Sequence, residues 1–202
     1  MKRLKWISGL FTTVALGALS AVPVQAQPAP DALIKTVATD VTTVLKSDPA
    51  ILSNAAKLKE LIENKLIPNF SFSRMTQLAM GRNWAKASPE QHVALTKEFQ
   101  TLLVRTYSGA LANFRNNTID VRPLRMQPAD TDVTVKTVIN QANGQGIPID
   151  YSLEKEPDGS WKAYDIIVAG VSLVTNYRDE FNTVIRDQGV DALVKQLQSK
   201  NK

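Results

Sequence analysis

The chain has 202 residues, of which 44% are hydrophobic, and carries a formal net charge of +5 at neutral pH. This length and composition suit one domain with an ordinary hydrophobic core. The absence of cysteine excludes disulfide staples and thiolate metal sites.

A secretory signal peptide accounts for much of the positive charge. Three basic residues precede an apolar run over residues 6–19, and small residues stand at Val24 and Ala26. The run is shorter than the about 20 apolar residues that a membrane span needs. We expect cleavage after Ala26, which removes residues 1–26 and leaves residues 27–202 as a single domain with a net charge of +2.

The charge of this mature domain bears on its partners and its compartment. It contains no basic run that would neutralise several phosphates, so nucleic-acid binding is not expected. An exported chain of this size that folds without disulfides suits the bacterial periplasm.

The first half of the domain has the periodicity of helices. Apolar residues over 33–45 recur at helical spacing, and Asp48 before Pro49 predicts the N-cap of a second helix that ends near Leu66. A short helix follows and is expected to stop at Gly81.

The clearest helix start is at Ser88, where a proline follows and Gln91 can complete a capping box. The helix is expected to run to about Arg115 with a wide apolar stripe. Gly109 lies in its interior at a cost of up to ~1 kcal/mol, which indicates a close backbone approach or an open space.

Beyond this helix the hydrophobic period changes from about 3.6 to 2. Four strands are expected, over residues 119–121, 133–139, 147–153 and 161–168. Short turns join them into a curved antiparallel meander with one apolar face. The long helix has a stripe wide enough to cover that face, so the predicted fold is α+β with additional N- and C-terminal helices.

The segment that follows the fourth strand is unusually apolar for a loop. Gly170 gives the backbone freedom to leave the sheet, and Val171, Leu173 and Val174 come directly after it. Such side chains are expected to lie against the protein's own core or against a bound hydrophobic molecule.

Catalytic motifs are mostly missing from the sequence. The single histidine, His92, is expected to be an ordinary surface residue without a partner, and neither a metal site nor a bound cofactor is expected. One option remains, in which Asp165 acts as a base beside a tyrosine in an apolar cavity. The structural alternative is that Asp165 pairs with Arg178 or caps a helix end.

Several stretches together resemble one family. They are residues 103–111, residues 161–166, residues 170–178 with Phe181, and residues 78–81 with Trp84. These stretches strongly resemble the MlaC family of toluene-tolerance, periplasmic phospholipid-binding proteins.

The resemblance implies an NTF2-like fold whose curved sheet and long helix enclose a pocket for glycerophospholipid acyl chains, with the lipid as cargo. It also implies a soluble shuttle that maintains outer-membrane lipid asymmetry, and we expect the protein to be a monomer. Its partners would be an outer-membrane lipoprotein-porin complex and an inner-membrane ABC transporter with an MCE-domain subunit.

The apolar faces of the expected helix and strands, together with the family resemblance, predict which residues form the pocket. The side chains expected to line or border it are Phe99, Leu102, Leu103, Val133, Val135, Ile149, Tyr151, Val168, Val171, Leu173 and Tyr177. Arg105 and Arg178 are expected at the mouth or in scaffold ion pairs. Two alternatives stay open: an NTF2-like cavity enzyme that uses Asp165 with a tyrosine, and a lipid-free envelope adaptor with a filled core.

Overall fold

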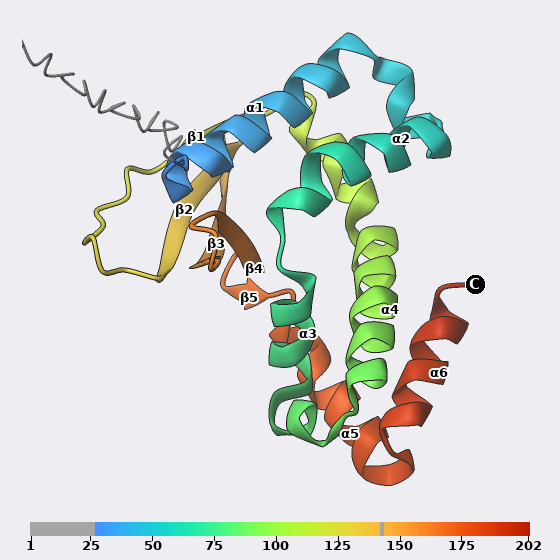
Figure 1. The fold of residues 1–202 in the computed structure, drawn as a ribbon. Coiled ribbons are helices and arrows are strands. Elements are labelled where there is room, and N and C mark those ends of the chain that lie inside the picture. Colours follow the sequence, from blue (N-terminus) through green and yellow to red (C-terminus); the bar gives the residue numbers. More distant parts are fainter. Residues whose placement is uncertain (1–26, 142–143) are drawn as a thin grey trace, which may run out of the picture.

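The computed structural model describes residues 27–141 and 144–202, so the predicted signal peptide lies outside the described residues. Helices precede and follow an antiparallel sheet, as the α+β prediction requires. Figure 1 shows α1 lying across the sheet, whereas α4 runs away from it between α3 and α6.

The N-terminal helices are α1 (Pro30–Ser47), η1 (Pro49–Ser53), α2 (Ala55–Leu61), η2 (Ile62–Leu66) and η3 (Ile67–Asn69). The predicted second helix is therefore broken. Asp48 does act as an N-cap, but for the short 3₁₀ helix η1. Asn54 caps α2 anew, because its side-chain oxygen accepts hydrogen bonds from the amides of Ala56 and Lys57, both at 3.1 Å.

The middle helices are α3 (Phe72–Met80), η4 (Gly81–Lys86), α4 (Pro89–Tyr107) and η5 (Ser108–Phe114). The capping box at the start of α4 is confirmed, since Ser88 and Gln91 exchange hydrogen bonds of 2.8 and 3.2 Å. The α-helix ends at Tyr107, earlier than predicted, and continues as 3₁₀ turns. A Cβ at Gly109 would meet nothing within 4 Å, so the residue borders open space.

The strands are β1 (Thr118–Val121), β2 (Asp132–Asn140), β3 (Gly146–Lys155), β4 (Trp161–Val168) and the short β5 (Val171–Ser172), in that order across the sheet. A bulge interrupts the pairing of β3 with β4, because Ser152 faces Asp165 while Leu153 faces Ala163 and Tyr164 is skipped. Ala163 and Ile166 are three positions apart, which would place them on opposite faces of a regular strand. The bulge lets both residues line the same apolar cavity.

The chain turns back at Gly170 instead of leaving the sheet. Ala169 and Gly170 both have positive φ, 49° and 85°, as a two-residue hairpin turn with right-handed twist requires. Val171 then pairs with Val168 in a fifth, short strand that was not predicted. The C-terminal helices η6 (Thr175–Tyr177), α5 (Arg178–Gln188) and α6 (Val190–Lys200) follow.

Three buried clusters make up the core. The largest joins α3, α4, α5 and α6 around Phe99 and Phe181. A second lies between the sheet and Ile34 of α1, and a third lies between the end of α1, the segment 51–67 and Leu111. The sheet is therefore covered directly by α1, while the C-terminal end of α4 with η5 faces it from across a gap between the clusters.

Candidate functional site

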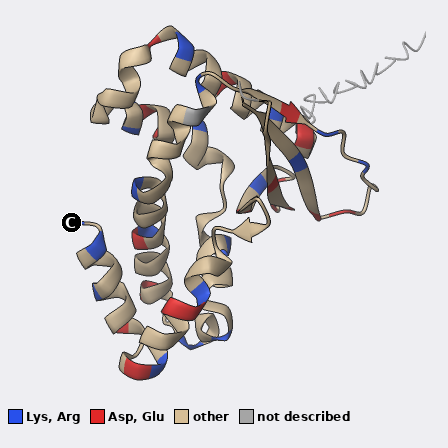
Figure 2. Cartoon of the chain, turned by 180° about the vertical axis from the view of Figure 1, so that it is seen from behind, with Lys and Arg blue, Asp and Glu red and all other residues tan. Residues whose placement is uncertain are grey.

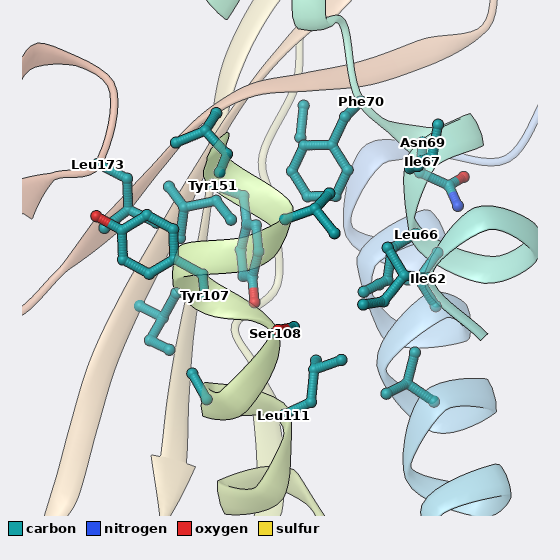
Figure 3. A pocket seen from close by; sticks show the side chains of 18 of the residues that line it. Ile62, Leu66, Ile67, Asn69, Phe70, Tyr107, Ser108, Leu111, Tyr151 and Leu173 are labelled. Carbon is teal, nitrogen blue, oxygen red and sulfur yellow. The ribbon is translucent and has the colours of Figure 1, made fainter. Parts of the chain in front are cut away.

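A cavity of about 410 Å³ lies between the three clusters, in the range typical of small-molecule pockets. Its walls come from four parts of the chain: α1, the segment from η2 to α3, the end of α4 with η5, and strands β3 and β4 with the residue that follows β5. Figure 3 shows the side chains of these parts converging from opposite sides on one space.

The wall is almost wholly apolar. The polar side chains in it are Asn69, Ser108 and the two tyrosines Tyr107 and Tyr151, and no charged side chain is among the described residues that line it. A site with this lining cannot neutralise a buried charge, but it can enclose hydrocarbon.

Five of the residues predicted from sequence lie in this wall: Leu103, Ile149, Tyr151, Val168 and Leu173. Those on the sheet share one face because Ile149 pairs with Val168 and Tyr151 pairs with Ile166 in regular antiparallel register. Leu173 reaches it because the β4–β5 hairpin returns the chain to the sheet.

The other predicted lining residues lie elsewhere. Phe99, Leu102 and Tyr177 belong to the helical cluster, where the Phe99 ring lies 5.1 Å from the rings of both Tyr177 and Phe181. The predicted apolar stripe of α4 is thus divided between the helical cluster and the cavity, and only its last turn faces the cavity.

Val133 and Val135 are buried against Ile34 of α1, in the part of the sheet that the helix covers directly. Val171 is 59% exposed, next to the turn of the β4–β5 hairpin on the short edge strand. The apolar segment is therefore divided: Val171 is exposed, Leu173 lines the cavity, and Val174 is fully buried in the helical cluster.

The part of the cavity wall that comes from α1 and from the segment between η2 and α3 was not predicted. The residues that line the cavity there are Ile34, Val37, Ala38, Val41, Ile62, Leu66, Ile67, Phe70, Phe72 and Met75. The signal was present in the regular apolar spacing of residues 33–45, which needs an apolar partner. The spacing does not tell whether that partner is protein or an open cavity.

Asp165 has a structural environment and is not in the cavity wall. Its carboxylate accepts hydrogen bonds from the amides of Ile166 and Val174, at 2.8 and 3.2 Å, and from the hydroxyl of Ser172 at 2.5 Å. The predicted pairing with Arg178 is wrong, because that guanidinium donates to the carbonyl oxygen of Leu78 at 3.0 and 3.1 Å. Asp165 instead holds the chain where η6 begins, close to the predicted capping role.

The tyrosines of this region are held in their protonated form. Burial raises the pKa of Tyr151 to about 12. Burial, with a smaller effect from the neighbouring Tyr177, raises the pKa of Tyr107 to about 12. Tyr164, outside the wall, donates to both carboxylate oxygens of Asp132 at 2.8 and 2.9 Å, and burial followed by this carboxylate raises its pKa to about 12.

His92 is not the unpartnered surface residue that was predicted. Its ring stacks on Trp84 with centroids 3.7 Å apart, and Nε2 donates to the carbonyl oxygen of Trp84 at 2.8 Å. Because a carbonyl only accepts, Nε2 carries the proton. The histidine therefore fastens η4 to the first turn of α4, away from the cavity.

The described part of the chain holds neither a cluster of metal ligands nor a helix suited to span a membrane. Within it, no three His, Cys, Asp or Glu side chains lie close enough together to hold a metal ion. No helix in residues 27–141 and 144–202 combines the length and the hydropathy needed to span a bilayer. Basic and acidic residues are interspersed over the helical part and the sheet (Figure 2).

The family of the chain follows from comparison with known proteins. The family described as MlaC protein matches residues 35–199. The chain belongs to the MlaC family. The match begins within α1 and ends within α6, and it takes in all four parts of the cavity wall with the exception of Ile34.

Two curated relatives and one solved structure illustrate the family. The intermembrane phospholipid transport system binding protein MlaC of Haemophilus influenzae is 26% identical over 73% of this chain and 73% of its own length. The toluene tolerance protein ttg2D of Pseudomonas putida is 30% identical over 52% of this chain and 48% of its own.

The solved structure is a phospholipid-binding protein from Ralstonia solanacearum in complex with a phospholipid. It is 42% identical to this chain, with a TM-score of 0.77, and the comparison covers 85% of this chain and 96% of that one. The NTF2-like α+β fold that the resemblance implied is thus confirmed.

Proposed function

We propose that this protein is a soluble phospholipid carrier that encloses acyl chains in the cavity between α1, η5 and the sheet. The observation that carries the proposal is the uncharged, apolar wall of this 410 Å³ cavity. It is supported by the 42% identity with a structure that holds a phospholipid. Leu103, Ile149 and Val168 are the predicted residues that would contact the chains, together with Leu173 and Tyr151.

The energetics of such a carrier favour an enclosed site. Each methylene exposed to water costs about 0.8 kcal/mol, so two sixteen-carbon chains would cost on the order of 20 kcal/mol in the open. A bilayer buries the same chains equally well. The free-energy difference between lipid in the carrier and lipid in the membrane is therefore small, and the direction of transfer must come from the partners.

Membership of the family supports a proposal for where the carrier works. The mature domain, residues 27–202, would act as a monomer in the periplasm after removal of the signal peptide 1–26. It would take glycerophospholipid between an outer-membrane lipoprotein-porin complex and an inner-membrane ABC transporter with an MCE-domain subunit. This traffic would maintain the lipid asymmetry of the outer membrane.

The two alternatives have less support. An enzyme built on Asp165 would need that carboxylate at the cavity, whereas its oxygens already accept hydrogen bonds from Ile166, Ser172 and Val174. A lipid-free adaptor would need a filled core, and a cavity of this size weighs against it.

A transfer assay tests the proposal. Delipidated mature protein is incubated with vesicles that contain a labelled phospholipid, separated from them by gel filtration, and then mixed with unlabelled vesicles. We expect the label to elute with the protein and to pass to the second vesicles. Protein that elutes without label under these conditions would contradict carriage.

A further inference from the structure

One polar group enters the apolar cavity without a partner. The hydroxyl of Tyr151 projects from β3 into the space next to Ser108 of η5 (Figure 3). In the described part of the chain, no side chain or backbone group forms a hydrogen bond with this hydroxyl. The other two described tyrosines with raised pKa have a polar neighbour, Tyr177 for Tyr107 and Asp132 for Tyr164.

The polar side chain that lies next to the hydroxyl in Figure 3 is that of Ser108. It donates to the carbonyl oxygen of Arg105 at 3.4 Å and forms no hydrogen bond with Tyr151. The other nearby walls are hydrocarbon, with Ile166 and Val135 as the direct cross-strand neighbours of Tyr151. Among the described residues, the side-chain atoms that are buried without a partner are Nε of Arg74 and Oδ1 of Asn201, so the Tyr151 hydroxyl is not sealed in the protein. It faces the accessible space of the cavity, where a bound molecule can supply the acceptor.

The phenol can act as a donor at any physiological pH. Burial raises its pKa to about 12, so it keeps its proton. What the cavity needs is therefore a neutral acceptor, because no charged side chain is available in the described wall to balance an anion.

We propose that the hydroxyl of Tyr151 donates a hydrogen bond to an ester carbonyl oxygen of the bound diacylglycerophospholipid. This inference rests on the function proposed above. A phospholipid offers two kinds of acceptor, phosphate oxygens and ester carbonyl oxygens. Only the ester is uncharged, and it joins directly to the acyl chains that the rest of the wall encloses. Tyr151 is thus a specificity-determining residue that recognises ester-linked lipid and sets how far its chains enter.

The consequence is a preference between two lipids that differ only in this group. A dialkyl ether phospholipid has the same chains and head group but lacks the carbonyl oxygens. The carrier should favour the diacyl form over the dialkyl form, and the Tyr151 hydroxyl should account for that preference.

The test measures the ratio of the two lipids taken up in competition. Delipidated wild type and Tyr151→Phe are each incubated with vesicles that contain equal amounts of diacyl and dialkyl phosphatidylglycerol of one chain length, and the bound lipids are quantified by mass spectrometry. Loss of one hydrogen bond should lower the diacyl-to-dialkyl ratio about two- to tenfold in the variant. Comparing the two proteins cancels any preference of the vesicles themselves.

Tyr164→Phe is the matched control, because it removes a phenol hydroxyl from the same sheet outside the cavity. Its ratio should equal that of the wild type. An unchanged ratio in Tyr151→Phe would overturn the proposal, as would an equal fall in Tyr164→Phe. Failure of the wild type to bind either lipid would instead contradict the carrier function itself.

Discussion

The carboxylate of Asp165 accepts a hydrogen bond from the hydroxyl of Ser172 across the hairpin that ends the sheet, at 2.5 Å. The same carboxylate accepts the amide of the fully buried Val174. The two contacts join the edge of the sheet to the start of the C-terminal helices. An aspartate that the sequence offered as a catalytic base therefore fixes the segment that carries Leu173 into the cavity wall.

Replacing Asp165 with alanine should lower stability. The change leaves the buried amide of Val174 unpaired, so we expect a loss of about 1–3 kcal/mol in the free energy of unfolding, measured by urea denaturation. Ser172→Ala should cost about 1 kcal/mol, and the double variant should cost less than the sum. Ser160→Ala, which removes a hydroxyl bonded to Asp158 in an exposed turn, is the control and should change stability little. Full stability of Asp165→Ala would refute this structural role.

Two substitutions in the turn between β4 and β5 should change the stability of the fold in opposite directions. Ala169 adopts φ of 49°, a conformation that asparagine tolerates better than alanine, so Ala169→Asn should stabilise the fold by about 0.5–1 kcal/mol. Gly170→Ala places a Cβ at φ of 85° and should destabilise by about 1–2 kcal/mol. Thermal denaturation of both variants checks the pair, and shifts in the same direction would rule out this account of the turn.

Filling the cavity should displace the cargo. Ala38 lines the cavity from α1, whereas Ala32 on the same helix is exposed and does not line it. Ala38→Trp should weaken phospholipid retention roughly 5- to 150-fold, the equivalent of an overpacking cost of about 1–3 kcal/mol. Ala32→Trp should bind like the wild type. Lipid content after gel filtration is the measurement, and equal retention in the two variants would place the cargo elsewhere.

Alkaline pH should destabilise the protein in part through Tyr151. Its pKa is raised from about 10 in the unfolded chain to about 12 in the fold, so the stabilisation is present below pH 10 and is lost as the pH rises through 12. In this window the free energy of unfolding should fall more steeply for the wild type than for Tyr151→Phe, by up to about 1.4 kcal/mol per pH unit. Parallel curves from pH 9 to 12 would show that burial of the phenol has no such effect.

Local signals in the sequence predicted most of the elements. Ser88 with Gln91 marked the start of α4, and the alternation over residues 133–139 identified the buried face of β2, because both depend on neighbours within a few positions. The bulge at Tyr164 left no such signal. The bulge depends on how β3 pairs with β4, and it decides which residues of β4 reach the cavity.

The site itself was predicted only in part, because an apolar stripe does not name its partner. Leu102 and Leu103 are consecutive residues of the same stripe, yet only Leu103 lines the cavity. The difference depends on α5 and α6, which return to α4 from the far end of the chain. The contribution of α1 to the cavity wall could not be predicted for a similar reason, because its apolar periodicity fits a helix packed in the core equally well.

The most direct test of the central claim is native mass spectrometry of the mature protein, purified gently from its own cell envelope, followed by lipid extraction. Phospholipid carriage predicts a complex whose added mass matches a phospholipid recovered in the extract. Lipid-free protein alone, both as purified and after incubation with phospholipid vesicles, would contradict it.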